Sequence, residues 1–353
     1  MKFLLCHKNV QICGECIIMF RGMHYFCEVL NLTGIINCVQ EDLTQLEDFL
    51  LDAVRGPRGF VGDACEYIIK SGGKRLRPAL FIVTARCGEN FSLKNVLPLA
   101  AALELIHTAS LVHDDVIDAA ALRRGVPTAH AKWGRQVSIL TGDYIFAAAF
   151  RLVAEGNYGD FVCRKLAKLV EDLSVGEIIE TQTAYTASAD FDDYYNRIRK
   201  KTADFLEICC ELGGAEAKLN PQDAQGLATY GHSIGMAFQI IDDVLDITES
   251  QEQIGKPAGN DIRQGITTLP VIRAMEVSLD RDELTAILKN PQMSDADAAR
   301  ALAIVRESDG ADFARAKAED FVERAKHALP DNLPPSIRNA LTEAADFIVK
   351  RDF

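Results

Sequence analysis

Two acidic motifs with the pattern D-D-x-x-D are the residues of this sequence best suited to metal chemistry. Their carboxylates are Asp114, Asp115, Asp118, Asp242, Asp243 and Asp246. Positions i and i+4 share a helix face, so each motif presents two carboxylates together, and each follows an apolar turn where an unpaired charge is costly. Two such stripes suit Mg²⁺, which accepts a few carboxylates, waters and phosphate oxygens. A solvated acidic face is the alternative, and it explains one motif more readily than two.

Basic residues near these motifs could bind a diphosphate. The segment Gly72–Pro78 combines a Gly-Gly turn, three cations and a proline suited to a helix start, where free backbone N–H groups attract anions. Side chains able to form charge-assisted hydrogen bonds with phosphate are Lys74, Arg77, Arg123, Arg124, Lys201 and Lys256. Each alone would more often be a surface residue. In a chain of net charge -13, their position beside the Asp motifs favours a functional role.

Together these groups predict the ionisation of a diphosphate ester. Metal ions neutralise the leaving diphosphate, and an apolar helical cavity keeps water away from a reactive carbocation. This chemistry needs neither a nucleophilic serine nor a Cys-His pair. The sequence has no G-x-G-x-x-G or G-x-x-x-x-G-K-[ST] loop in a strand–helix context.

Helices must position these side chains, because the sequence has helical periodicity and few strand signals. Leu43, Leu46 and Leu50 recur at helical spacing, and no proline falls between Pro127 and Pro221. That long stretch is rich in Ala, Leu, Ile, Glu and Lys, which favours several long helices. The sequence predicts one all-α domain over residues 39–353.

The composition is that of a soluble globular protein: 353 residues, 48% hydrophobic, with 51 acidic and 38 basic side chains. The acidic balance argues against sequence-independent binding to nucleic acid, which requires an excess of Lys and Arg. No apolar run is long enough to predict a membrane span, and the N-terminus is a poor signal peptide. We therefore expect a cytoplasmic protein with reduced cysteines.

The first 38 residues differ from the rest, because they hold five of the ten cysteines. We expect residues 1–38 to be a Cys-rich extension outside the fold, or the product of an upstream start codon, with Met23 as one possible start. Cys13, Cys16, His24 and Cys27 could in principle hold zinc, but one C-x-x-C is a weak signal.

Several stretches, taken in order, resemble the trans-isoprenyl diphosphate synthases, the polyprenyl synthetase family. They are Gly72–Pro78, Glu104–Asp115, Arg123–Thr128, Gly142–Tyr144, Lys201–Ala203, Phe238–Asp243 and Gly255–Gly259. The resemblance implies an isoprenoid synthase-like bundle of about ten or more helices around a deep central cavity, usually as a homodimer. It also implies chain elongation. Geranyl or farnesyl diphosphate ionises, isopentenyl diphosphate attacks head to tail, and a proton is lost to the departing diphosphate.

Matching motif positions implies a role for each site residue. Up to three Mg²⁺ ions would bind Asp114, Asp118 and Asp242, with Asp115, Asp243 and Asp246 as further ligands or partners of ligands. Isopentenyl diphosphate would contact Lys74, Arg77, His107 and Arg124. The allylic diphosphate would contact Arg123, Lys201, Thr202, Gln239 and Lys256. Thr202 and Gln239 would offer oxygen dipoles to the developing cation.

Two departures from the family pattern matter. Many members carry a lysine where this chain has Ile266, although long-chain members often lack it too. Where some members have Gly-Gln-x-x-Asp, this chain has Gly176 followed by Glu177 and, three residues later, Glu180. Glu180 preserves an acidic group at that position.

Small residues before the first Asp motif predict a long product. Short-chain members place bulky aromatics four or five residues before the first Asp, where this chain has Ser110 and Ala109. Ile106 lies about 12 Å down the helix, so the chain should grow past Ala109 and beyond C20. We expect Ala109→Tyr to shorten the product. The alternative is that small residues only allow close helix packing.

Other functions share part of this pattern. A short-chain (C15 or C20) synthase and the catalytic subunit of a two-chain synthase would carry the same motifs. A terpene cyclase or head-to-head synthase would lack the Gly72–Pro78 site. A helical scaffold would need no such ordered set of charges. The apolar product suggests transient contact with a membrane for its release.

Overall fold

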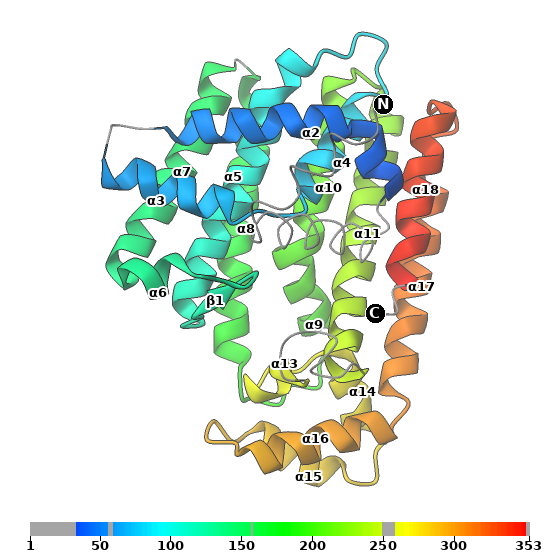
Figure 1. Ribbon diagram of the computed structural model, residues 1–353. Coiled ribbons are helices and arrows are strands. Elements are labelled where there is room, and N and C mark those ends of the chain that lie inside the picture. Colours follow the sequence, from blue (N-terminus) through cyan, green and yellow to red (C-terminus); the bar gives the residue numbers. More distant parts are fainter. Residues whose placement is uncertain (1–32, 56–58, 157, 249–257, 351–353) are drawn as a thin grey trace, which may run out of the picture.

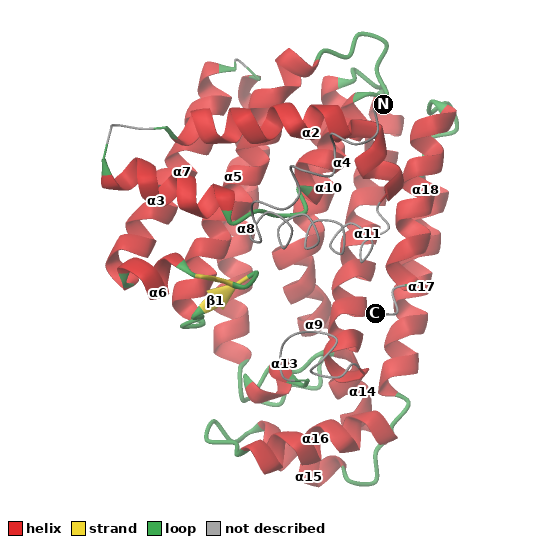
Figure 2. Ribbon diagram, in the orientation of Figure 1, coloured by secondary structure: helices red, strands yellow, loops and turns green. Residues whose placement is uncertain are grey.

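The protein is a bundle of helices with one short hairpin, in the part of the chain that the structure describes (Figures 1 and 2). The computed structural model describes residues 33–55, 59–156, 158–248 and 258–350. Its helices are α2 (Thr33–Val54), α3 (Phe60–Lys70), α4 (Leu76–Ala85), α5 (Leu93–Ile117), α6 (Ala129–Trp133), α7 (Arg135–Glu155), α8 (Gly159–Thr183), α9 (Phe191–Ile198), the π-helix η1 (Arg199–Ala203), α10 (Asp204–Glu216), α11 (Pro221–Thr248), α13 (Asn260–Arg263), α14 (Leu269–Val277), α15 (Arg281–Leu288), α16 (Asp295–Glu307), α17 (Gly310–Ala328) and α18 (Pro335–Val349). Strands β1 (Leu122–Arg123) and β2 (Val126–Pro127) pair antiparallel. The predicted all-α fold is confirmed.

Long helices form the middle of the bundle, where α5 packs on α7, and α11 packs on both α10 and α17 (Figure 1). Glycines allow α11 to approach its neighbours closely. A Cβ at Gly231 would lie 2.4 Å from the Leu206 carbonyl oxygen, and a Cβ at Gly235 would lie 2.6 Å from Cα of Ala203. This close approach brings η1 against the half of α11 that carries the second Asp motif.

The N-terminal boundary differs in detail from the expected one. Helix α2 begins at Thr33, and Ile35 is buried in the main core. The fold therefore includes residues that we expected to lie in the extension. The zinc interpretation and the alternative start at Met23 fall on residues 1–32, outside the described residues.

Helices α5 and α7 are long and apolar enough to cross a membrane, by length and composition alone. The apolar window of α5 is 67% buried inside the protein and that of α7 is 44% buried, so this is weak evidence for a span. Core helices of soluble proteins have the same composition. Helix α7 nevertheless leaves Ile139, Leu140 and Phe150 exposed.

Candidate active site

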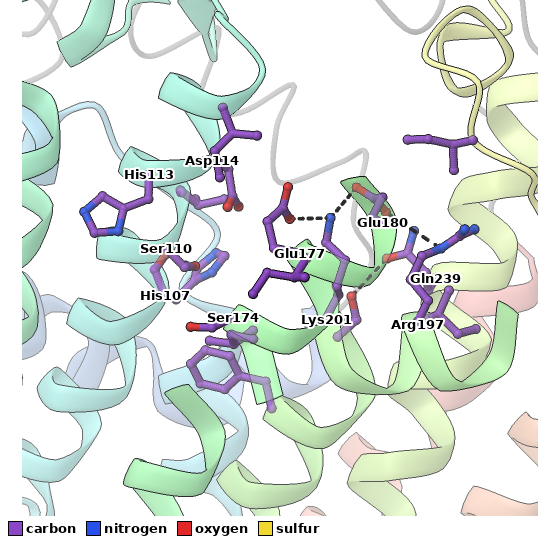
Figure 3. A pocket seen from close by; sticks show the side chains of 18 of the residues that line it. His107, Ser110, His113, Asp114, Ser174, Glu177, Glu180, Arg197, Lys201 and Gln239 are labelled. Atoms are coloured by element: carbon purple, nitrogen blue, oxygen red, sulfur yellow. Dashed lines mark hydrogen bonds and ion pairs between the residues drawn. The ribbon is translucent and has the colours of Figure 1, made fainter. Parts of the chain in front are cut away.

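A cavity of about 520 Å³ lies between α5, α8, η1 and α11 (Figure 3). Its charged lining consists of Arg77, Asp114, Glu177, Glu180, Arg197, Lys201, Asp243 and Asp261. Its apolar lining consists of Leu111, Ile117, Phe146, Val170, Leu173, Ile178, Ile198, Phe205 and Ile266. Convergent charges set into an apolar wall are typical of a small-molecule site.

The first Asp motif lies where α5 ends. Burial and the nearby Glu177 carboxylate raise the pKa of Asp114 from 3.8 to about 7. Burial and Glu177 also raise the pKa of Asp118, which caps α5. Among the described residues, neither carboxylate makes a hydrogen bond or an ion pair. This oxygen donor set, crowded and lacking a bonded counterion, fits Mg²⁺, which would hold Asp114 and Asp118 in their charged forms.

Asp115 has a different environment from its two motif partners. The Arg123 Nε donates a hydrogen bond to Asp115 Oδ1 at 2.7 Å, which ties the β1–β2 hairpin to α5. The hairpin turns through Arg124 and Gly125, whose φ angles are 54° and 79°, as a tight two-residue turn requires. Asp115 therefore fixes the position of the Arg123 side chain.

The second Asp motif forms the opposite wall, on α11. Asp243 is buried and accepts hydrogen bonds from the Tyr194 hydroxyl at 2.7 Å and from Gln239 Nε2 at 3.0 Å. Burial raises the pKa of Asp243 to about 7. Asp246 accepts from the backbone N–H groups of Asn260 and Asp261, at 3.1 and 3.2 Å. Asp242, which directly precedes Asp243, is half-buried. Asp243 and Asp246 thus hold the site together, while Asp242 stays the expected metal ligand.

Asp261 is a cavity residue that the sequence analysis missed. It lies on α13, directly after the left-handed turn at Gly259 (φ 71°). Burial raises its pKa well above the ordinary value, and the Asp243 and Asp246 carboxylates add to the effect. Its place two residues beyond the Gly255–Gly259 motif was the available signal.

Three of the four expected isopentenyl diphosphate residues, Arg77, His107 and Arg124, lie close together; Arg77 and His107 are half-buried and Arg124 is exposed. Arg77 Nη1 lies 2.9 Å from His107 Nε2, and the Arg124 guanidinium lies over Gly73, where a Cβ would be 3.0 Å from Arg124 Nη1. Burial lowers the pKa of Arg77 and of Arg124. Burial and the neighbouring arginines, Arg77 first, lower the pKa of His107 well below its ordinary value, so it is neutral. Arg77 Nε is buried without a hydrogen-bond partner among the described residues, as expected for a donor that awaits an anion.

Arg75, in the same segment, is structural instead. It adopts a left-handed conformation (φ 49°) at the start of α4. Its guanidinium pairs with Glu47 and with Glu104, each at 2.6 Å. Of the three cations in this segment, Lys74, which is exposed, and Arg77 remain the candidates for contact with a ligand.

We expect Arg75→Met to lower the free energy of unfolding by about 3 kcal/mol, because it leaves Glu104 buried without its closest partner. The side chains of Arg75 and Glu104 are only 5% and 4% exposed. Urea unfolding measures the loss. Lys74→Met is the matched control: it should keep the stability and raise the KM for isopentenyl diphosphate. Equal unfolding midpoints for Arg75→Met and wild type would contradict this structural role.

Lys201 and Thr202 come from η1, a π-helical turn of the kind often found at functional sites. Lys201 Nζ donates to Glu177 at 2.8 Å and to Glu180 at 2.5 Å. Thr202 Oγ1 donates to Gln239 Oε1 at 3.0 Å, and Gln239 in turn donates to Asp243. The structure therefore places all three residues at the cavity. Lys256 lies outside the described residues.

Of the three expected chain-length residues, one lines the cavity and two lie in the core. Ser110 lines the cavity, as do Phe146 and Leu173. Ala109 and Ile106 are fully buried in the core and are not among the lining residues. Any effect of α5 on product length should therefore act first through Ser110.

The raised pKa of Asp114 predicts how stability in EDTA depends on pH. A carboxyl with a folded pKa near 7 and an unfolded value near 3.8 stabilises the fold below about pH 4, and this contribution is lost as pH rises through 7. The free energy of unfolding should therefore fall between pH 5 and pH 8. Asp114→Asn should flatten part of that slope and be more stable than wild type at pH 8, by on the order of 1 kcal/mol. Parallel pH profiles of the two proteins, measured by urea unfolding, would contradict this.

Comparison with known proteins agrees with this geometry. Residues 59–305 match the family model "Polyprenyl synthetase". The chain is 37% identical over 326 residues to the heptaprenyl diphosphate synthase component 2 of Geobacillus stearothermophilus, covering 92% of this chain and 100% of the relative. It is 33% identical to the nonaprenyl diphosphate synthase of Mycobacterium tuberculosis, covering 89% and 93%. The polyprenyl synthase of Caulobacter crescentus CB15, solved with calcium and isoprenyl diphosphate, superposes with a TM-score of 0.83 at 32% identity, covering 91% and 98%.

Fold and site together define an enzyme that transfers prenyl groups between diphosphates. The chain belongs to the polyprenyl synthetase family, and it is a trans-isoprenyl diphosphate synthase. The family and the enzyme class that the sequence motifs implied are both confirmed.

Proposed function

We propose that the protein elongates geranyl or farnesyl diphosphate with successive isopentenyl diphosphates, giving an all-trans long-chain polyprenyl diphosphate and releasing diphosphate. One observation supports this proposal: one cavity contains two separate groups of side chains that could each bind a diphosphate. Asp114 and Lys201 mark the first site, and the Arg77–His107 pair marks the second. A cyclase would need only the first site, since it binds no isopentenyl diphosphate.

In the proposed reaction, Asp114, Asp118 and Asp242 would hold Mg²⁺, and the bound ion would supply the positive charge that the leaving diphosphate needs. Arg123, Lys201 and Lys256 give that diphosphate further charge-assisted hydrogen bonds. Thr202 and Gln239 direct oxygen dipoles at the allylic cation, oriented through Asp243 and Tyr194. Arg77, Arg124, Lys74 and neutral His107 hold isopentenyl diphosphate in place for attack. The apolar wall excludes water from the cation.

A product longer than C20 follows from small Ser110 at the cavity wall. Relatives named for heptaprenyl and nonaprenyl products support this length. The short-chain alternative has support too, because a relative named short chain isoprenyl diphosphate synthase is 35% identical. Product length therefore has to be measured.

The active form that we propose is a cytoplasmic homodimer. Ile139, Leu140 and Phe150 form an exposed apolar face on α7, and a second copy of the chain would cover it. The two-chain alternative rests on relatives named "component 2". Light scattering of the purified protein, alone and with vesicles, tests both the dimer and the transient membrane contact expected for product release.

Product analysis tests the proposed function. Purified protein is incubated with Mg²⁺, labelled isopentenyl diphosphate and each allylic primer, and the dephosphorylated alcohols are separated by length. A ladder that ends beyond C20 is the expected result. A stop at C15 or C20 keeps the enzyme class and contradicts the length argument. No incorporation favours the two-chain alternative, and a partner chain would then be sought.

A further inference from the structure

The Lys201 ammonium lies within a group of carboxylates that come from two helices. Glu177 and Glu180, on one face of α8, bind it directly at 2.8 and 2.5 Å. At the end of α5, the pKa values of Asp114 and Asp118 are raised by burial and by Glu177 and lowered by Lys201. Figure 3 shows Glu177 between Asp114 and Lys201, with its side chain in the same cavity. The ammonium thus lies where the surrounding carboxylates could also bind a metal cation.

We propose that Glu177 is a further metal ligand, which joins Asp114 and Asp118 when Mg²⁺ binds, and that Lys201 holds this place until then. The inference rests on the proposed function, because the metal is the one that its chemistry requires. Binding would be an exchange of partners. Glu177 would release Lys201 and offer its carboxylate oxygen to the metal ion, and Lys201 would turn to the allylic diphosphate, with no covalent bond made or broken.

The positions of Glu177 and Glu180 differ, although both bind Lys201: Figure 3 shows Glu177 on the side of Lys201 that faces Asp114, and Glu180 on the other side. Besides burial, Glu177 is the main cause of the raised pKa of Asp114 and of Asp118, and Glu180 adds a smaller effect at Asp118. Glu180 instead lies toward the opposite wall, where Arg197 Nε is 3.8 Å from its Oε2 and where it also affects Asp261. Of the two glutamates, Glu177 is therefore the one placed to share a metal ion with the first Asp motif.

The backbone supports this arrangement at Gly176. A Cβ at this position would lie 2.9 Å from Lys201 Cγ, so glycine lets α8 approach the π-helical turn closely. The approach brings Lys201 to Glu177, and neighbouring Lys200 to Asp172 at 2.5 Å. Although burial opposes it, Glu180 and Glu177 raise the pKa of Lys201, so the ammonium stays charged and competes with a metal ion for Glu177.

Metal binding without substrate tests the proposal, with Mn²⁺ as the probe and free Mn²⁺ counted by electron paramagnetic resonance. We expect Glu177→Gln to weaken Mn²⁺ binding by about tenfold or more. Glu177→Asp should weaken Mn²⁺ binding as well, since the shorter aspartate keeps the charge but moves the carboxylate oxygens away from the metal site. Glu180→Gln, which removes the same charge and also a Lys201 partner, should change it by less than about threefold. Glu171→Gln, on the exposed face of α8, is the second control.

Lys201→Met gives an opposite and independent expectation. Removing the competing ammonium should strengthen Mn²⁺ binding by about threefold or more, and the gain should disappear in the Glu177→Gln/Lys201→Met double variant. Circular dichroism confirms that each variant is folded. Wild-type affinity in Glu177→Gln, or equal losses in Glu177→Gln and Glu180→Gln, would overturn the proposal. Product analysis of the wild-type protein separates the two proposals. If wild type elongates its primer, the proposed function stands whatever the Mn²⁺ results; if wild type incorporates no isopentenyl diphosphate, the proposed function fails.

Discussion

Asp114→Asn is expected to lower turnover by about a thousandfold while the protein stays folded. The amide keeps the size of the side chain but removes the charge that holds the metal ion against the leaving diphosphate. Burial and Glu177 already raise the pKa of Asp114 to about 7, so the charged carboxylate destabilises the fold unless a cation binds it. The same substitution should therefore increase stability in EDTA at pH 8, because it removes a buried charge.

A fall in turnover together with a rise in stability distinguishes a metal ligand from a structural residue. A residue with a purely structural role would lose both together. Single-turnover kinetics with saturating Mg²⁺ measure the rate, and urea unfolding in EDTA measures the stability. Asp160→Asn at the start of α8 is the matched control, since its side chain is 94% exposed, and it should change neither quantity. A turnover within tenfold of wild type in Asp114→Asn would contradict the metal role.

Helical periodicity explains how much of the site could be predicted. Asp114 and Asp118 do share a face, as positions i and i+4 must. The same periodicity turns the neighbouring Asp115 toward Arg123, and Asp243 toward Tyr194. Spacing predicts that adjacent carboxylates diverge, but it does not identify the partner. The partner of Asp115 comes from the β1–β2 hairpin, and that of Asp243 comes from α9, 49 residues away in the sequence.

Contacts between distant segments account for what the sequence did not reveal. Arg75 looked like one of three equivalent cations, yet its left-handed backbone and the Glu104 carboxylate direct it into the fold. Glu177 appeared only as a departure from a family motif. Its relation to Asp114 and Lys201 depends on how α8 meets η1, which no local pattern encodes.

Ser110→Tyr is expected to convert the main product from beyond C20 to C20 or shorter, with little change in the first condensation. Ser110 lines the cavity four residues before Asp114, about 6 Å down α5. Its hydroxyl donates to the His107 carbonyl oxygen at 2.9 Å, so it lies close to the helix and leaves the cavity open. A tyrosine ring there would fill part of the cavity that Phe146 and Leu173 also line, and it would block the growing chain.

The adjacent position supplies a sharp contrast. Ala109 is fully buried, so Ala109→Tyr should overpack the core and cost about 1–3 kcal/mol of stability, with less effect on length than Ser110→Tyr. Ser110→Ala, which keeps the wall small, should leave the product ladder unchanged. Chromatography of the dephosphorylated alcohols measures all three variants against wild type. If Ser110→Tyr still makes the wild-type product while Ala109→Tyr shortens it, the growing chain follows the other face of α5, as the sequence alone had suggested.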